Sequence, residues 1–391
     1  MQSELHPVIQ QAVDFTETFK QHSDKHPAIR EALCLKTQFP ALMGPIQPGD
    51  IFAGSQAEYR ITWLGTMWFA RLDTGGNAKQ GGYCFDFRAL ERFSENEADR
   101  RAVEELAEYW AEHYTPGRVR AQWDEELLQF MRGGGPAAGG GTGFIVAPDL
   151  DRLVQRGIPG LRADVEARME RAREDGEPLE FLKALDMALD TLVDVCRHYE
   201  DQAREMAAKA SDAGERVHLE TMADALGGIV DHAPQTLREA MQLGWLYVLM
   251  TNAKHPELWR PDVAFGDLYA KDIDEGRLTE DEALELVMGL WQRVYTQGDK
   301  AVCRTLIGGK GRRNEENADR FAMAAMEATR RHRKVIPQLT LRFYDGQAPA
   351  LFSKALDVLG EGCIFPMLYN DDVIIPGVAE ALNVSEEEAQ R

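Results

Sequence analysis

The sequence predicts an α/β protein whose first part is mainly helical and whose last part forms a parallel β/α sheet or barrel. From residue 161 to residue 250, apolar side chains recur almost continuously at helical spacing. After residue 300, short apolar runs of strand character alternate with amphipathic helical segments. Strands that alternate with helices in this way pair in parallel through right-handed crossovers. The chain has 391 residues, 44% of them hydrophobic, which is enough for one large domain or a few smaller ones.

The N-terminal region is predicted to be helical and polar over residues 1–40, as an arm that packs on a larger body. A turn at residues 45–50 then precedes a strand-like segment at residues 51–53. Residues 102–113 predict an amphipathic helix, because apolar side chains share one face at helical spacing: Val103, Leu106, Ala107 and Trp110. Another short helix is expected at residues 121–132.

Capping boxes predict where three later helices begin. They start at Thr236, Thr279 and Ser385, each followed three residues later by a glutamate. In such a box the hydroxyl and the carboxylate each accept a backbone N–H of the first turn. The helix opened by Ser385 has only its first turn before the sequence ends, and the sheet before it is incomplete. The sequence is therefore expected to be the front portion of a longer protein.

The C-terminal region predicts an alternation of strands and helices: strand 301–307, helix 317–331, strand 338–344, helix 349–359 and strand 363–367. Polar residues follow the last of these strands: Tyr369, Asn370, Asp371 and Asp372. They are expected to form a turn at the carboxyl end of the strand, where α/β proteins place their chemistry. The alternative is a solvated acidic turn without a role in binding.

The composition excludes some classes of function. The net charge is −21 and the pI is about 4.9, so no basic surplus is present to neutralise nucleic-acid phosphates or an anionic membrane. No export signal and no apolar run of bilayer length occur, which favours a cytoplasmic protein. The five cysteines are scattered without CxxC spacing, so neither a disulfide framework nor a zinc site is predicted. Cys196 lies on an apolar helical stripe and is expected in the core.

Charged residues gather in the irregular segment 251–262, directly after an apolar helix. Glu257, Arg260 and Asp262 are candidate binding residues there, and the alternative is a surface loop with a weak local ion pair. The glycine-rich segment 133–143 lacks the Lys-Ser/Thr pair of a P-loop and is expected to be a simple loop. The histidines have no ligand spacing, so no metal site is predicted.

Several motifs resemble those of the glycyl radical enzymes, the pyruvate formate-lyase-like family. Residues 369–376 and then 384–389 resemble the segment that leads to the catalytic cysteine loop of these enzymes. Further matching motifs occur in the family's order: Pro234 with residues 239–243, residues 271–273 with 275–279, residues 306–309, and Pro337 with Leu339, Thr340 and Arg342. The resemblance is strongest over residues 141–391 and weaker over residues 27–113.

The resemblance implies a fold and a radical chemistry. Members of the family form a ten-stranded β/α barrel from two half-barrels, wrapped in helices. A thiyl radical forms on a cysteine loop inside the barrel, and a glycyl radical near the C-terminus stores it. That radical is installed by an S-adenosylmethionine-dependent iron–sulfur activating enzyme, and no other cofactor is expected. Residues 1–391 then supply the N-terminal part of the pyruvate formate-lyase-like domain, with 1–250 as helical wrap and 251–391 as half-barrel.

The sequence also departs from the family pattern. None of the five cysteines matches the radical cysteine, and the glycine-radical domain is absent, so no catalytic residue is assigned. Cys363, on the predicted strand before the turn, is a weak candidate for a substitute radical carrier. By the resemblance, Glu257, Arg260, Asp262 and Phe144 are substrate-binding positions, although Glu257 replaces a serine and Phe144 a more polar residue. Tyr369, Asn370 and Asp371 are expected to form the barrel wall near the cysteine loop.

Two functions are expected from these observations. The first is the N-terminal portion of a glycyl radical enzyme acting on a small polar metabolite, by radical elimination as in dehydratases or by carbon–carbon cleavage as in pyruvate formate-lyase. This portion alone is expected to be inactive. The second is a non-catalytic subunit or remnant that binds a ligand or a partner half-barrel. The expected partners are a small-molecule substrate, the activating enzyme, and either a second copy or the missing C-terminal half.

Overall fold

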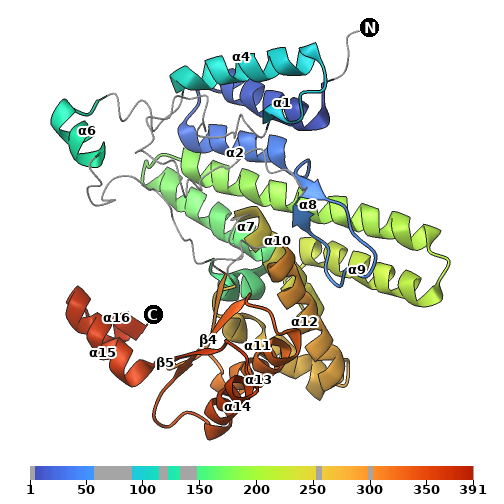
Figure 1. Cartoon of the computed structure of the whole chain (residues 1–391), viewed down its shortest axis with the longest axis vertical. Coiled ribbons are helices and arrows are strands. Elements are labelled where there is room, and N and C mark those ends of the chain that lie inside the picture. The colour runs from blue at the N-terminus through green and yellow to red at the C-terminus, as the bar shows by residue number, and fades with distance from the viewer. Residues whose placement is uncertain are drawn as a thin grey trace. The chain divides into compact units, whose positions relative to one another are not determined.

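The computed structural model describes residues 5–56, 90–113, 122–132, 148–251, 258–297 and 303–390. The chain divides into two compact units. The first comprises residues 1–43, 56–146 and 168–191, and the second comprises residues 44–55, 147–167 and 192–391. The predicted division at residue 250 stays a prediction. Figure 1 shows the helices and strands in the colours of the chain order.

The first unit is mainly helical where the structure describes it, as the sequence predicts. Its helices are α1 (Pro7–Gln21), α2 (Pro27–Gln38), α4 (Glu97–His113) and α6 (Glu125–Arg132). Trp110 of α4 is almost completely buried, and its ring centroid lies 4.9 Å from that of Phe19 on α1. Its indole Nε1 donates to Thr16 Oγ1 at 2.9 Å. This buried hydrogen bond fixes α4 against α1, because an unpaired indole N–H in the core would be costly.

Helices also form most of the second unit. Those with residues in both units are α7 (Leu150–Glu174) and α8 (Glu180–Lys209). The second unit continues with α9 (Ala213–Asp231), α10 (Leu237–Thr251), α11 (Pro261–Asp274) and α12 (Glu280–Gln297). The capping boxes predicted at Thr236 and Thr279 are confirmed: Glu239 N donates to Thr236 Oγ1 and Glu282 N to Thr279 Oγ1.

The strand predicted at residues 51–53 is wrong. Two-residue strands lie on either side of it instead, β1 (Met43–Gly44) and β2 (Ser55–Gln56). The backbone of Ala53 is occupied by the buried Gln242 side chain, which accepts its N–H at 2.9 Å and donates to its C=O at 2.9 Å. The side-chain amide therefore satisfies the groups that a neighbouring strand would otherwise pair.

The C-terminal part of the second unit is a parallel three-stranded sheet with crossover helices. Its elements are β3 (Arg304–Gly308), α13 (Glu315–His332), β4 (Gln338–Phe343), α14 (Pro349–Gly360), β5 (Met367–Asn370), α15 (Asp371–Leu382) and α16 (Glu386–Gln390). The strand order is β3-β4-β5, with Leu306 opposite Thr340 and Thr340 opposite Met367. The predicted alternation of strand and helix is thus confirmed, and the structure matches part of a β/α barrel.

The last strand begins later than the sequence predicts. Residues 363–366 are irregular, and β5 starts only at Met367. Pro366 explains the shift, because proline has no N–H to donate to a sheet ladder. The turn predicted at residues 369–372 is therefore wrong, because Tyr369 and Asn370 belong to the strand and Asp371 opens α15. The side chain of Asn370 caps that helix by accepting Asp372 N at 3.0 Å.

The two faces of the sheet differ in how far other parts of the protein cover them. On one face Leu339 and Leu341 are fully buried, and the ring of Phe343 lies 4.8 Å from that of Phe352 on α14. By strand register, Arg342 and Tyr369 share the opposite face, and Tyr369 is 38% exposed. Thr340 on this second face is buried, so the face is accessible only near its carboxyl edge.

Candidate functional site

A glycine turn ends β3 at the carboxyl edge of the sheet. Gly308 and Gly309 have positive φ values of 74° and 90°, which glycine adopts without strain. A Cβ at Gly309 would lie 2.8 Å from Asp371 Oδ2 and 3.0 Å from Arg342 Nε. The turn therefore requires glycine for its backbone and also for its close approach to two charged side chains.

One side of this turn is held by Arg260 and Asp262. Asp262 is fully buried in the first turn of α11, and its Oδ2 accepts the N–H of Gly308 at 2.8 Å. A terminal NH2 of Arg260 donates to the Gly308 carbonyl at 2.9 Å. The Nε of Arg260 lies 3.5 Å from Asp262 Oδ1. The two candidate residues thus meet each other and the end of β3.

A buried arginine completes this side. Arg312 donates from Nε to the Gly309 carbonyl at 2.9 Å and pairs with Asp262 at 3.4 Å and Asp319 at 2.6 Å. Burial disfavours its charge, but Asp262 and Asp319 outweigh that effect and raise the pKa of Arg312. The ion pairs therefore keep a buried guanidinium charged beneath the turn.

The other side of the turn is held by Asp371. This carboxylate is fully buried, accepts the N–H of Lys310 at 2.9 Å through Oδ2, and accepts Arg342 Nε at 2.8 Å through Oδ1. The neighbouring Asp372 pairs with the Lys310 ammonium and accepts Asp345 N at 2.7 Å. The Lys310 hydrogen bond lowers the pKa of Asp372. Asp371 and Asp372 thereby connect the ends of all three strands.

The structure brings most of the predicted residues to one place. Arg260 and Asp262 contact Gly308, while Asp371 contacts Lys310 two residues later. Tyr369 and Asn370 lie at the end of β5, next to Asp371. Glu257 and Phe144 lie outside the described residues, as does the glycine-rich segment 133–143.

Sequence reasoning missed Gly309, Lys310 and Arg312 as residues of this site. The pair Gly308–Gly309 directly after an apolar strand was the available signal, since paired glycines mark a turn with positive φ. Lys310 and Arg312 carried no comparable signal, because single basic residues after a turn are common on any surface.

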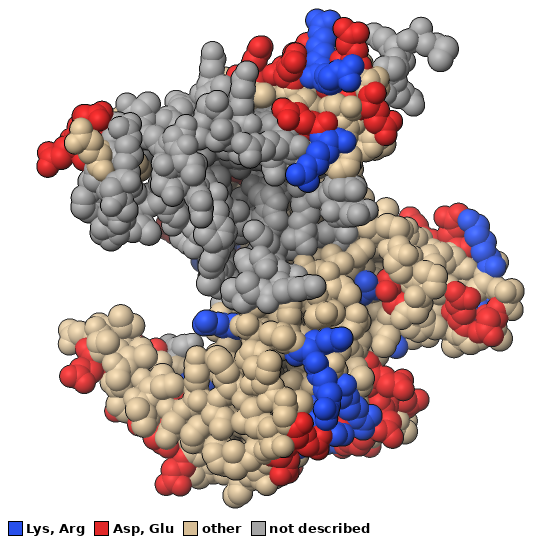
Figure 2. Space-filling view, in the orientation of Figure 1, with Lys and Arg blue, Asp and Glu red and all other residues tan. Residues whose placement is uncertain are grey.

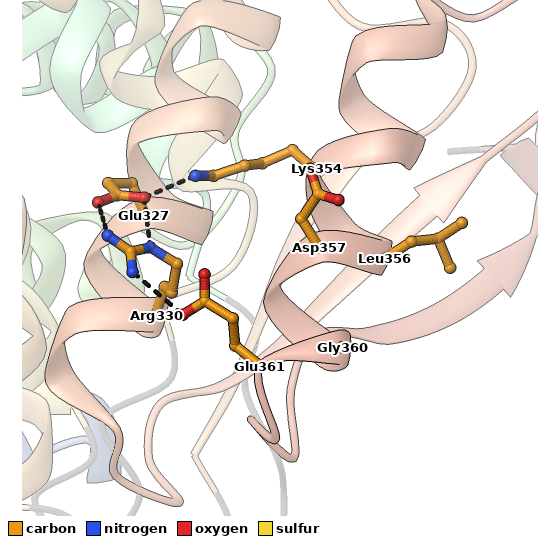
Figure 3. Close-up of a pocket in the computed structure, with 7 residues that line it drawn as sticks. All are labelled: Glu327, Arg330, Lys354, Leu356, Asp357, Gly360 and Glu361. Atoms are coloured by element: carbon orange, nitrogen blue, oxygen red, sulfur yellow. Dashed lines mark hydrogen bonds and ion pairs between the residues drawn. The ribbon is translucent and has the colours of Figure 1, made fainter.

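A concave region is lined by residues of α13 and α14 (Figure 3). Glu327 receives hydrogen bonds there from Arg330 and Lys354, which point toward it in the close-up. Arg330 also reaches Glu361. These bonds hold the pKa of Glu327 well below its usual range. Since its charged groups mostly satisfy one another, this region stabilises the helices and is not our candidate site.

Charged side chains on the visible surface also lie near groups of opposite charge. In the part of the chain that Figure 2 colours, basic side chains lie mostly beside acidic ones. Among the described residues, no three His, Cys, Asp or Glu side chains gather closely enough to hold a metal ion. The described helices also include none that is long and apolar enough to cross a bilayer.

The cysteines differ in environment. Cys196 is fully buried as predicted, and burial raises the pKa of its thiol to about 12. Cys34 and Cys303 are buried too, whereas Cys363 is partly exposed in the segment before β5. Cys84 lies outside the described residues.

The three-stranded parallel sheet with its crossover helices matches part of a β/α barrel. The family model described as pyruvate formate lyase-like matches residues 1–391. The chain therefore belongs to the pyruvate formate lyase-like family, and the expected resemblance is confirmed.

Known proteins agree with this assignment. The probable dehydratase YbiW of Escherichia coli (strain K12) is 23% identical over 405 residues, which cover 94% of this chain and 48% of the relative. A structure from work on 1,2-propanediol dehydration in Roseburia inulinivorans aligns with a TM-score of 0.77 and 21% identity, covering 97% of this chain and 50% of the other. A glycyl radical enzyme from Archaeoglobus fulgidus aligns with a TM-score of 0.75 and 20% identity, covering 99% and 52%. The chain spans about half the length of these relatives.

Proposed function

We propose that this chain is the N-terminal half of a glycyl radical enzyme that acts on a small polar metabolite by radical elimination. The supporting observation is that the whole chain matches the family while it spans about half of each relative. Elimination is preferred to carbon–carbon cleavage because YbiW is named a probable dehydratase and the Roseburia structure concerns a dehydration.

The barrel has a physical purpose in such chemistry. Residues 251–391 would supply one half of a ten-stranded barrel, and residues 1–250 its helical wrap. A closed barrel excludes water and stray reductants from a radical that would otherwise be quenched. The second half would carry the radical cysteine and the radical glycine, and an S-adenosylmethionine-dependent activating enzyme would install the radical. The proposal includes a cytoplasmic location, with a second copy of the chain or the missing C-terminal half as partner.

The site residues take distinct roles in this proposal. Arg260, Glu257 and Phe144 contact the substrate. Asp262 is a positioning residue, because its buried carboxylate holds both Arg260 and the Gly308 turn. Tyr369, Asn370 and Asp371 form the wall beside the cysteine loop, where Asp371 couples β4 to the turn after β3.

The test combines the gene and the purified protein. The DNA beyond codon 391 is sequenced, and the protein is purified without oxygen from its native locus and incubated with its activating enzyme. We expect the cysteine and glycine motifs in the same or a neighbouring reading frame, and a glycyl radical signal in electron paramagnetic resonance. Alanine in place of the radical glycine is the control, since it removes the signal without changing this chain.

The opposite result supports the second function. If no neighbouring frame carries both motifs and the chain purifies alone without a radical, it is a non-catalytic subunit or remnant. Ligand binding then has no catalytic consequence, and the elimination proposal is wrong.

A further inference from the structure

Arg342 lies on the second face of the sheet, at the accessible carboxyl edge. By register it lies opposite Gly308 on β3 and Tyr369 on β5, so the three positions share this face. Its side chain is 15% exposed, whereas that of Asp371 behind it is fully buried. The buried Asp371 carboxylate therefore holds the guanidinium on one side, and solvent reaches it at the carboxyl edge of the second face.

Only one edge of this guanidinium is used. Nε donates to Asp371 Oδ1 at 2.8 Å, while its two terminal NH2 groups have no hydrogen-bond partner among the residues that the structure describes. Polar groups this close to burial are normally paired. Arg312, by contrast, is engaged with Gly309, Asp262 and Asp319. Arg260 contacts Asp262 through Nε and the Gly308 carbonyl through one NH2 group.

The chemistry of the two unpaired NH2 groups of Arg342 indicates which class of ligand they can bind. A guanidinium has donors and no acceptor, and its fork of N–H groups matches the paired oxygens of an oxyanion. A neutral hydroxyl would occupy one donor, and an ammonium group would be repelled. The neighbouring Tyr369 is 38% exposed and can add a phenolic donor from the next strand.

We propose that Arg342 and Tyr369 bind an anionic oxygen group of the substrate, a carboxylate or a sulfonate. This inference rests on the proposed function, because it names the substrate class of the same site. Asp371 acts as the positioning residue, since its bond to Nε directs the terminal NH2 groups away from the buried side. The substrate is then a hydroxylated acid rather than a neutral polyol.

The experiment compares ligands that differ only in the anionic group. The pairs are glycerate and glycerol, and 2,3-dihydroxypropane-1-sulfonate and 1,2-propanediol. Dissociation constants and turnover are measured without oxygen on the complete enzyme from its native locus. For at least one pair we expect the anion to bind more tightly by about 10- to 100-fold, as hydrogen bonds to charged groups imply.

Variants assign that preference to residues. Tyr369→Phe should weaken binding of the anionic ligand by about 3- to 10-fold and leave binding of the neutral ligand unchanged. Arg342→Lys should remove most of the preference, because an ammonium lacks the fork. Arg331→Lys is the matched control, since Arg331 makes the same 2.8 Å bond from Nε to a carboxylate, Glu327, on the outer side of α13.

The outcomes separate the two proposals. Binding and turnover of the neutral ligands without preference for any anion overturns this inference and leaves the proposed function intact. Equal weakening of both members of a pair by Tyr369→Phe and Arg342→Lys also overturns it, since the residues would then be structural. A wild-type enzyme that binds none of the four compounds and carries no radical contradicts both.

Discussion

Arg342 and Asp371, which are 2.8 Å apart at Nε and Oδ1, join the second strand of the sheet to the helix that follows the third. Asp371 also accepts the backbone N–H of Lys310 after the first strand. A single buried carboxylate therefore determines the relative position of three strand ends. Removal of this carboxylate should destabilise the whole carboxyl edge of the sheet.

Asp371→Asn is expected to lower the free energy of unfolding by about 3–5 kcal/mol, because it leaves the Arg342 charge without its buried partner. Urea denaturation at pH 7 measures the loss. Asp372→Asn is the matched control: it removes the neighbouring carboxylate, which is 35% exposed in its side chain, and should have a much smaller effect. Equal losses in both variants would contradict the central role of Asp371.

Gly309→Ala separates steric fit from backbone strain. The new Cβ would approach Asp371 Oδ2 to 2.8 Å at a φ of 90°, whereas Gly346, at a φ of 93°, has nothing within 4 Å. Gly346→Ala should cost about 1–2 kcal/mol from the left-handed backbone alone. Gly309→Ala should cost clearly more, measured by thermal unfolding. Similar melting temperatures for both variants would show that the turn has room for a side chain.

The Glu327 network predicts a pH-dependent contribution to stability. Hydrogen bonds from Arg330, then Lys354 and Arg331, lower the pKa of Glu327 from its ordinary value of 4.5. The stabilisation is therefore present above pH 4.5 and is lost as the pH falls through the lowered pKa of the folded state. Glu327→Gln should cost about 1–3 kcal/mol at pH 7 and progressively less in acid.

Chemical denaturation of both proteins between pH 3 and pH 7 provides the measurement. Glu285→Gln, on an exposed position of α12, is the control and should leave the pH profile unchanged. A gap between wild type and Glu327→Gln that stays constant down to pH 3 would refute the assigned cause.

Thiol labelling tests the assigned environments of the cysteines. Cys363 should react with iodoacetamide in the native protein, because its side chain is partly exposed. Cys34 and Cys196 should stay unmodified at pH 8, since burial raises the pKa of each thiol to about 12. Peptide mass spectrometry after a timed pulse of iodoacetamide gives the order in which the cysteines are labelled. Labelling in urea confirms that all of these cysteines react when they are exposed. Faster native labelling at Cys196 than at Cys363 would contradict the buried assignment.

Local patterns predicted much of the second unit. Thr236 and Thr279 begin their helices where the capping boxes place them, since those contacts involve residues only three apart. The irregular backbone at Ala53 was missed because it depends on a buried amide distant in sequence. The start of β5 was misplaced although Pro366 was a local signal for it. Likewise, Arg260 and Asp371 were each recognised alone, while their common turn at Gly308–Lys310 arises only from tertiary pairing.

The outer edge of β5 has a consequence for handling the protein. Among the described strands, β4 alone pairs with β5, so the far row of backbone N–H and C=O groups has no strand partner there. On α15, the helix that follows β5, the apolar side chains of Val373 and Leu382 are 68% and 67% exposed. An open edge beside apolar surface is a template for strand addition. Polypeptide 1–391 alone should therefore self-associate as its concentration rises, and whatever covers this edge should act as its solubility partner.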